Sequence, residues 1–408
     1  MKRIIAKLKS NDKNDLFFVV VFFLIITIPL VWFPIKYVLV SSGLSTPVIT
    51  DNWIFYEKTG TNILGKYEDL VEGTKISIEN RVNNYFPFFN LLTTNYYNMN
   101  SALNKILYKD DIIFGKNSDG EVIIYNSEGF YYALNKYSDN ELEKRYIKQI
   151  EFFNDLASNT NLNLSIYLPI RYDLTIMQNR GLYKYLDRFK GDIDSRYNTD
   201  YLSVSNNEEY LKYYYKTDHH WNAFGALAGY KDIANLLNIN VKTDYAIEQV
   251  EGINYYGSMA KSMLSTRLSD NFYDINSSKV MNILSISNGD YRNFKPRIAK
   301  VNKNEFYDYY VGYFNGQYGH VKYEGNSSTD RNLLIFSDSF SWQIDYLIAE
   351  SFNETHVINL RYNEFIEKNF DLNKYVIDNN ISDVLFMYEG VATLFDQFDY
   401  NIAGRIVF

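Results

Sequence analysis

The chain has 408 residues, of which 46% are hydrophobic and 17% aromatic, so it can bury a sizeable core in one or two domains. Its formal net charge of −8 argues against nucleic acid as a partner, because nucleic-acid-binding surfaces are usually basic. The chain has no cysteine, which fits a compartment where disulfides are not used but does not identify one.

The N-terminus predicts a membrane anchor. An apolar run without charged residues extends from Leu16 to Ile35, and it follows a cluster of basic residues: Lys2, Arg3, Lys7, Lys9 and Lys13. A helix of about 20 apolar residues can cross a bilayer. The run exceeds the apolar part of a typical signal peptide and no small-residue cleavage site follows it, so a retained anchor is favoured over a cleaved signal. The basic residues place the N-terminus in the cytoplasm and the rest of the chain outside.

This pattern predicts a single-pass protein of the cell membrane, divided into four parts. We expect a cytoplasmic basic tail at 1–14, a transmembrane anchor at 15–41, a linker or lead-in at 42–75, and an extracytoplasmic domain at 76–408. Within the lead-in, residues 48–56 form a possible strand.

The first part of the predicted domain combines a helical stretch with a β-hairpin. Residues 76–107 have a mainly helical pattern, broken at Pro87. Residues 111–125 predict a β-hairpin, because two short apolar runs flank a polar turn at 117–120 that ends in glycine.

Strands and helices alternate in the rest of the domain. Amphipathic or helical patterns cover 140–157, 183–189, 222–237, 341–352 and 363–379, and short apolar runs typical of buried strands cover 164–168, 333–336, 356–360 and 383–388. This alternation predicts an α/β fold with a parallel sheet and helices on both faces. Residues 242–326 are rich in Gly, Ser, Tyr and Asn, and we expect them to form an insertion of strands and loops.

Two short stretches carry the candidate chemistry. In the first, Tyr215 to Asn222, an extended backbone would put Asp218 and His220 on one side and His219 on the other. Asp218 could then orient the imidazole of His220, leaving its second nitrogen free as a base. Asn222 is a plausible N-cap for the helix that follows, and the positive end of that helix would keep His220 neutral.

The second stretch runs from Leu333 to Ser341, and it places Ser339 where a buried strand feeds a helix. Sites in parallel α/β folds lie at this carboxyl edge of the sheet. A nucleophilic serine there, with backbone N–H groups of the bend near an oxyanion, would complete a Ser-His-Asp site. The ordinary alternative is a serine that only caps a helix.

The motif Thr217-Asp218-His219-His220-Trp221-Asn222, with Gly225-Ala226 after it, resembles the signature of the DHHW family. That family is similar to the SGNH-hydrolase-like proteins of alginate O-acetylation, in which an Asp-x-His-Trp motif precedes a Gly-Asp-Ser-Phe-like block. Ser337-Asp338-Ser339-Phe340 matches this block, with Ser337 in place of the usual glycine. The likeness spans about 76–408, and Asp-His before Ser is the permuted motif order of that group.

The resemblance implies an SGNH-like, flavodoxin-like sheet and an extracytoplasmic O-acetyltransferase without a cofactor. Its partners would be a membrane-bound O-acyltransferase as acyl donor and a cell-surface or exopolysaccharide as acceptor. Ser339, His220 and Asp218 would be catalytic, while Arg171, Trp221 and Tyr256 are candidates for substrate contact. Arg171 follows a predicted sheet strand, although a surface pairing with Asp173 is the simpler reading. The stretch 255–258 could line an acceptor groove or only pack a loop.

Three alternatives remain at this point. The same three residues would serve a carbohydrate acetylesterase, in which water replaces the sugar. The chain could instead be a non-catalytic polysaccharide-binding or assembly subunit. A zinc site at His219 and His220 is disfavoured, because the only other histidines are His320 and His356 and there is no cysteine, so distant carboxylates would have to complete it. We therefore expect no metal.

Overall fold

The computed structural model describes the part of the chain that carries both candidate motifs. The described residues are 112–116, 122–125, 129–134, 138–170, 182–241, 245–262, 268–277, 282–287, 290–293, 307–314, 319–325, 327, 329–361, 369–396 and 401–408. Apart from Tyr307 they belong to one compact unit. The predicted tail, anchor, lead-in and 76–107 helical stretch, together with Arg171, lie outside the described residues. Among the helices that are described, none has the length and apolar character needed to cross a membrane.

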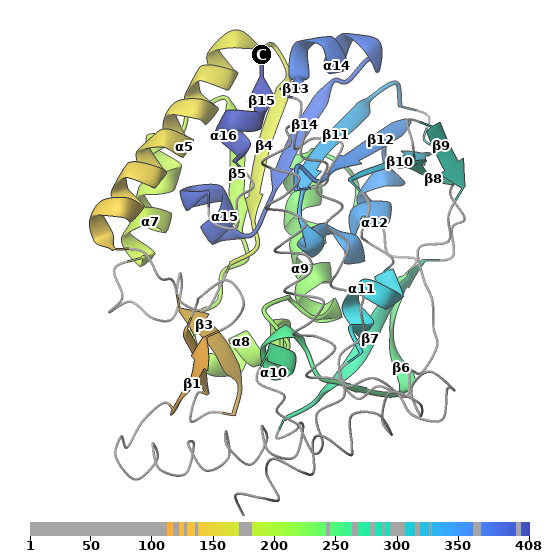
Figure 1. Cartoon of the computed structure of the whole chain (residues 1–408). Coiled ribbons are helices and arrows are strands. Elements are labelled where there is room, and N and C mark those ends of the chain that lie inside the picture. The colour runs from red at the N-terminus through yellow and green to blue at the C-terminus, as the bar shows by residue number, and fades with distance from the viewer. Residues whose placement is uncertain are drawn as a thin grey trace, which may run out of the picture. The chain divides into compact units, whose positions relative to one another are not determined.

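An eight-stranded sheet forms the centre of this unit (Figure 1). In spatial order its strands are β5 (Tyr197–Tyr201), β4 (Asn163–Leu168), β14 (Asp383–Met387), β11 (Asn332–Ser337), β12 (Glu354–Ile358), β10 (His320–Glu324), β8 (Asn282–Ser287) and β9 (Asp290–Asn293). Neighbours from β5 to β12 pair in parallel, whereas β10, β8 and β9 continue the sheet antiparallel. The predicted parallel sheet is therefore a mixed one dominated by parallel strands.

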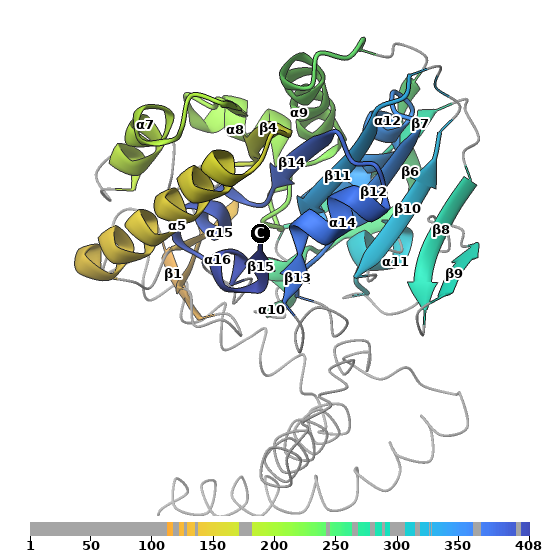
Figure 2. The same ribbon diagram turned by 90° about the horizontal axis from the view of Figure 1, so that it is seen from above.

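Helices cover both faces of the sheet, as the alternation of strands and helices predicts (Figure 2). Along β11, Leu334 and Phe336 point into one core, and Leu333 and Ile335 point into the other. The first core is covered by α5 (Asp139–Asn159), α7 (Tyr183–Asp192), α14 (Leu372–Asp378), α15 (Gly390–Phe395) and α16 (Ile402–Arg405). The second is covered by α8 (Asn207–Tyr213), α9 (Ala223–Leu236) and α12 (Asp345–Ala349). Because β11 is buried on both faces, its sequence is a continuous apolar run.

Smaller elements surround this sheet. They are the three-stranded meander of β1 (Ile112–Lys116), β2 (Val122–Tyr125) and β3 (Tyr131–Leu134), the antiparallel pair β6 (Tyr245–Tyr255) and β7 (Asp270–Ser277), the short parallel pair β13 (Phe370–Asp371) and β15 (Ile406–Val407), and the helices α10 (Ser258–Ser262) and α11 (Tyr309–Phe314). The predicted hairpin at 111–125 is confirmed by the antiparallel pairing of β1 with β2.

Two helix predictions need correction. The expected helix at 341–352 begins earlier, as the 3₁₀ helix η3 (Ser339–Gln343), and continues as the short α12. The expected helix at 363–379 is described from 369 onward, where Phe370 pairs with Ile406 before α14 begins. In the first place the Asp338 side chain accepts from the Phe340 N–H and starts the 3₁₀ turn; in the second, the pairing with β15 keeps 370–371 extended, so tertiary contacts override the local helical pattern.

A buried carboxylate holds the amino ends of the parallel strands together. Asp383 lies at the start of β14, and its side chain is 1% exposed. It accepts a hydrogen bond of 2.6 Å from Arg331, the residue just before β11. It also accepts from Asn163 of β4 at 3.2 Å and from Ser382 at 2.6 Å. One charged group thus ties together the beginnings of three neighbouring parallel strands, which sets their relative register where they enter the sheet.

Removing the arginine of this cluster should destabilise the fold. Arg331→Ala leaves the Asp383 carboxylate buried with only its neutral donors, and we expect a loss of about 1.5–3 kcal/mol in the free energy of unfolding. A matched control is Lys374→Ala, which breaks the exposed i,i+4 pair with Asp378 on α14 and should cost about 0.5 kcal/mol or less. Urea denaturation of the three proteins measures both values, and equal losses in the two variants would contradict the role given to Asp383.

Candidate active site

The serine segment is a fixed turn at the carboxyl end of β11. The Asp338 carboxylate is 2% exposed and accepts from the backbone N–H groups of Phe340 and Glu389, both at 2.9 Å. Since Glu389 follows β14, the turn is bound to the end of the neighbouring strand. Ser337, which replaces the usual glycine, shares a hydrogen bond of 2.9 Å with the Ser341 hydroxyl. Ser339 itself is partly exposed at the start of η3.

The histidine segment is a closed loop and not the extended stretch predicted above. Tyr214 and Trp221 form an isolated antiparallel bridge, and the Asn222 N–H donates to the Tyr213 carbonyl at 2.8 Å. Residues 216–220 form the bends of the loop between them. The predicted N-cap is confirmed, because the Asn222 side chain accepts from the N–H groups of Phe224 and Gly225 at the start of α9. The loop is therefore fixed at both ends.

The two segments bring an acid, an imidazole and a hydroxyl into one line. His220 Nε2 lies 2.6 Å from Ser339 Oγ, although the residues are 119 positions apart in the chain. On the other side of the ring, His220 Nδ1 lies 3.1 Å from Asp218 Oδ1. In this arrangement the imidazole can take a proton from the hydroxyl while the carboxylate holds the opposite nitrogen.

His219 does not point away, contrary to the prediction from an extended backbone. Its Nδ1 lies 2.9 Å from Asp218 Oδ1 and 2.7 Å from Ser258 Oγ, and its ring centroid is 3.9 Å from that of His220. The bends of the loop turn the two adjacent rings to the same side. With 44% of its side chain exposed, His219 also forms part of the surface of the site.

Asp218 is a buried carboxylate that accepts several hydrogen bonds. Besides His220, its donors are the Ser258 hydroxyl at 2.7 Å, the His219 N–H at 2.7 Å and the Tyr255 hydroxyl. Burial by itself would raise the pKa of this carboxyl, but the two imidazoles and their hydrogen bonds hold the pKa well below its ordinary range. Asp218 is therefore ionised at neutral pH, as an orienting residue must be.

His220 is 6% exposed and packs between aromatic rings. Tyr310 stacks on it, with centroids 3.9 Å apart and planes at 11°, and Phe340 lies 5.1 Å away. Burial lowers the pKa of His220 to about 4, His219 acts in the same direction, and Asp218 opposes them. The expected neutral base is thus reproduced, but its main cause is burial and not the positive end of a helix.

Three side chains that support the site were not assigned this role from the sequence. They are Tyr255, Ser258 and Tyr310, and all belong to the insertion at 242–326. The Tyr310 hydroxyl also donates to the Ser339 carbonyl at 3.0 Å. The sequence singles out 255–258 only as a possible groove lining, since no local pattern shows that these hydroxyls meet an aspartate nearly 40 positions earlier.

Gly257 is required by a close approach of the two segments. A Cβ at this position would lie 2.3 Å from Asp218 Cβ and 2.7 Å from the Thr217 carbonyl oxygen. The Gly257 N–H donates to the Thr217 hydroxyl at 2.9 Å. Any larger residue here would push apart the segment that carries Asp218 and the one that carries its donors.

The three candidate substrate contacts have different positions. Trp221 is fully buried and therefore offers no surface to a substrate. Its Nε1 donates to the Phe340 carbonyl at 3.0 Å, so it supports the serine turn instead. Tyr256 is half-buried and lies between Tyr255 and Gly257, beside the residues that hold Asp218. Arg171 lies outside the described residues, so its expected contact stays a prediction.

The same site contains the one group of candidate metal ligands among the described residues, namely Asp218, His219 and His220. Their ligand atoms lie within 4.8 Å of one another. The observed contacts use these atoms in another way, because His220 Nε2 faces Ser339 and the carboxylate accepts from several donors. The arrangement fits proton transfer better than a metal centre, which would need these atoms free.

Comparison with known proteins supports the fold. No protein-family model matches the sequence, and no curated protein matches it. Two structures of Bacillus cereus PatB1, one with a sulfonyl adduct, match at 20% identity and a TM-score of 0.53; the matches cover 68% of this chain and 98% and 99% of theirs. The chain has the PatB1 fold.

A DHHW family protein from Eubacterium siraeum matches at 18% identity with a TM-score of 0.50, covering 69% of this chain and 94% of that one. The O-acetyltransferase domain of Pseudomonas putida AlgJ matches at 10% identity with a TM-score of 0.40, a likeness too low to argue from. The suspected likeness to DHHW proteins is thus met by a solved structure of that family, whose fold this chain shares. At these identities the likeness shows the fold alone.

The pKa of His220 predicts an unusual pH profile. The imidazole accepts a proton only when neutral, and its pKa of about 4 keeps it neutral well below pH 6.5. For a small acetyl ester, kcat/KM should therefore stay level down to about pH 5 and fall about tenfold per pH unit below about pH 4. A decline that begins near pH 6.5 in folded protein would contradict the buried, neutral state of this histidine.

The control for this profile is the fraction of protein that remains folded at each pH, because unfolding would also lower activity. Burial also lowers the pKa of His320 to about 3 and that of His356 to about 4. Unfolded histidines take up protons near pH 6.5, so the unfolded state binds more protons than the folded state below that pH, and stability falls as the pH drops from about 6.5 towards 4. Circular dichroism in the same buffers separates unfolding from loss of the base.

The aromatic ring of Tyr310 should help to keep the pKa of His220 low. Tyr310→Ala removes the stacked ring, exposes the imidazole to water, and should move the acid limb of kcat/KM upwards, towards about pH 6.5. Tyr310→Phe keeps the ring and loses the hydroxyl that bonds to the Ser339 carbonyl and to Gln343, so the limb should stay where it is in the wild type. If the two variants shift the limb equally, the stacking does not control the pKa.

Proposed function

We propose that the chain is an acyltransferase that uses Ser339 as nucleophile, His220 as base and Asp218 as the residue that orients the base. The observation that carries the proposal is the 2.6 Å contact between Ser339 Oγ and His220 Nε2, made at the carboxyl edge of the sheet by two segments far apart in sequence. The structural neighbours with this fold include PatB1, an acetyltransferase, of which one structure carries a sulfonyl adduct.

The first half of the reaction forms an acyl-enzyme. Ser339 Oγ attacks the acyl carbon of the donor while its proton passes to His220 Nε2, and the Asp218 carboxylate stabilises the imidazolium. The Ser339 N–H, which donates to no other described residue, is a suitable donor for the oxyanion. When the tetrahedral intermediate collapses, the bond from the acyl carbon to the leaving group breaks and His220 returns the proton to that group.

The second half transfers the acyl group to an acceptor. A sugar hydroxyl attacks the acyl carbon, His220 takes the hydroxyl proton, and the bond to Ser339 Oγ breaks. His220 then protonates Ser339, so that the enzyme is restored and an ester is released. If water attacks instead, the same steps give hydrolysis, which makes the choice of acceptor the point that separates a transferase from an esterase.

The proposal extends to the setting of the reaction. The acceptor would be a cell-surface or exopolysaccharide, and a membrane-bound O-acyltransferase would supply the acyl group outside the cytoplasm. The apolar run from Leu16 to Ile35, preceded by basic residues, supports a single membrane anchor that holds the domain beside such a partner. Tethering of this kind raises the effective concentration of two proteins, to about mM for short flexible links.

Substitution of the three residues tests the chemistry. Ser339→Ala and His220→Ala in the full-length chain should each lower turnover of a small acetyl ester by roughly 10⁴-fold or more, and Asp218→Asn somewhat less. The matched control is Ser341→Ala, since Ser341 lies two residues on but is buried and bonded to Ser337, and its loss should leave turnover within about tenfold of wild type. Wild-type turnover in Ser339→Ala would favour a binding or assembly subunit.

Product analysis separates transfer from hydrolysis. With a small acetyl ester and oligosaccharides of the organism's own polymer, mass spectrometry should detect acetylated sugar at the expense of free acetate, and none with Ser339→Ala. Oligosaccharides that never gain an acetyl group, together with pre-acetylated ones that lose theirs rapidly, would replace the transferase by a carbohydrate esterase.

A further inference from the structure

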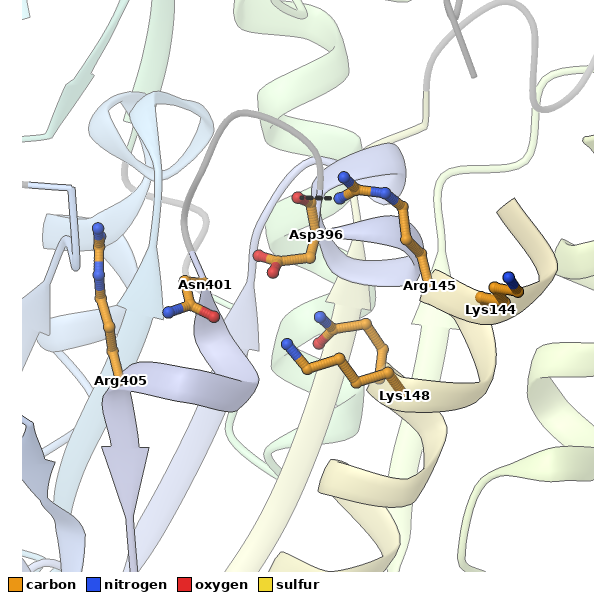
Figure 3. A pocket seen from close by; sticks show the side chains of 7 residues that line it. Lys144, Arg145, Lys148, Asp396, Asn401 and Arg405 are labelled. Atoms are coloured by element: carbon orange, nitrogen blue, oxygen red, sulfur yellow. Dashed lines mark hydrogen bonds between the residues drawn. The ribbon is translucent and has the colours of Figure 1, made fainter. Parts of the chain in front are cut away.

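A cavity lies between α5 and the C-terminal helices, and none of its lining residues belongs to the serine site. Its volume is about 560 Å³, within the range of about 300–1,000 Å³ usual for small-molecule sites. Seven residues line it: Lys144, Arg145, Lys148 and Gln149 of α5, Asp396 after α15, Asn401 before α16, and Arg405 of α16. Figure 3 shows the lysines and Arg145 on α5, and Asp396, Asn401 and Arg405 on the C-terminal segment that faces it.

The lining is strongly cationic in an acidic protein. Four basic side chains meet a single carboxylate here, while the whole chain has a formal net charge of −8. Lys144 and Lys148 are exposed, so their ammonium groups remain available to a ligand. Arg145 and Arg405 are fixed in the wall, because their Nη1 atoms donate to backbone carbonyls, of Phe395 and Asp396 in one case and of Leu360 in the other.

Gln149 adds an observation that charge alone does not explain. Its side chain is 1% exposed, and neither its amide oxygen nor its amide nitrogen has a hydrogen-bond partner among the described residues. Buried polar groups in folded proteins nearly always have partners, and an unpaired one costs about 1–3 kcal/mol. An amide that offers both a donor and an acceptor fits a ligand hydroxyl, which can accept from the nitrogen and donate to the oxygen.

We propose that this cavity binds an anionic sugar unit, with its phosphate or carboxylate against Lys148, Lys144 and Arg405 and a ring hydroxyl against the Gln149 amide. Exposed lysines with fixed guanidinium groups recognise the anion, while the buried amide selects for a hydroxylated ring over a bare ion. The site lies apart from the serine and its binding step needs no acyl transfer, so the inference goes beyond the proposed function.

Calorimetric titration of the full-length protein tests the site with defined probes, namely glucose 1-phosphate, glucuronate, inorganic phosphate and glucose. The sugar phosphate and the uronate should bind more tightly than inorganic phosphate, and glucose should not bind measurably. The Ser339→Ala protein should give the same affinities, so that failure of the catalytic proposal leaves this result intact. No binding of either anionic sugar, or equal affinity for inorganic phosphate and glucose 1-phosphate, overturns the proposal.

Three variants locate the binding. Lys148→Glu reverses one exposed charge in the cavity and should weaken glucose 1-phosphate about tenfold or more, whereas Lys231→Glu makes the same change on α9, over the opposite face of the sheet, and should leave affinity unchanged. Gln149→Leu should bring the affinity for glucose 1-phosphate down to that for inorganic phosphate without loss of thermal stability, because it removes an unpaired buried amide. If Lys148→Glu and Lys231→Glu bind alike, the ligand lies elsewhere, and this holds even if Gln149→Leu fails to fold.

Discussion

The site depends on keeping one carboxylate charged where water cannot reach it. Asp218 is 1% exposed, and a buried charge is costly unless donors surround it. Its donors come from its own loop and from the start of the insertion, through His219, His220, Tyr255 and Ser258. The orientation of His220 follows from this arrangement, because Asp218 holds one ring nitrogen. Its neutral state has a different cause: burial beneath Tyr310 lowers the pKa of the imidazole, and the Asp218 charge opposes this.

The sheet fixes the positions of the two loops that carry the site. β11 ends at Ser337, and the Asp338 carboxylate links the following turn to the residue after β14. The histidine loop reaches the same edge because Asn222 starts α9, which packs on one face of the sheet, and because Trp221 bonds to the Phe340 carbonyl. A hydroxyl and an imidazole from distant parts of the chain are thus positioned by rigid elements, which favours a stable contact over a transient one.

The sequence predicted the elements and residues whose signals are local. The strands at 164–168 and 333–336, the N-cap Asn222, and the meeting of Asp218, His220 and Ser339 all follow from patterns within a few residues or from motifs of known order. The extended form of residues 217–221 was wrong, because the bridge between Tyr214 and Trp221 and the contact with Gly257 impose a bent loop that no local pattern encodes. The same limit hid Tyr255, Ser258 and Tyr310, whose roles exist only in the folded chain.

The antiparallel extension of the sheet was missed for a related reason. β8, β9 and β10 lie in a segment of weak periodicity, and their place beside β12 depends on pairing partners far away in sequence. The segment at 242–326 therefore has two roles that composition could not separate. Its strands complete the sheet, and its tyrosine and serine hydroxyls complete the site.

The close approach of Gly257 to Asp218 also sets a limit on protein engineering. A designer would naturally exchange the whole insertion for that of another protein, treating it as a module. The same exchange would remove two donors to the Asp218 carboxylate, the ring that stacks on His220, and the glycine that lets the two segments meet. A grafted segment would therefore have to retain Tyr255, Ser258, Tyr310 and Gly257. The insertion and the geometry of the site are thus not separable units of this chain.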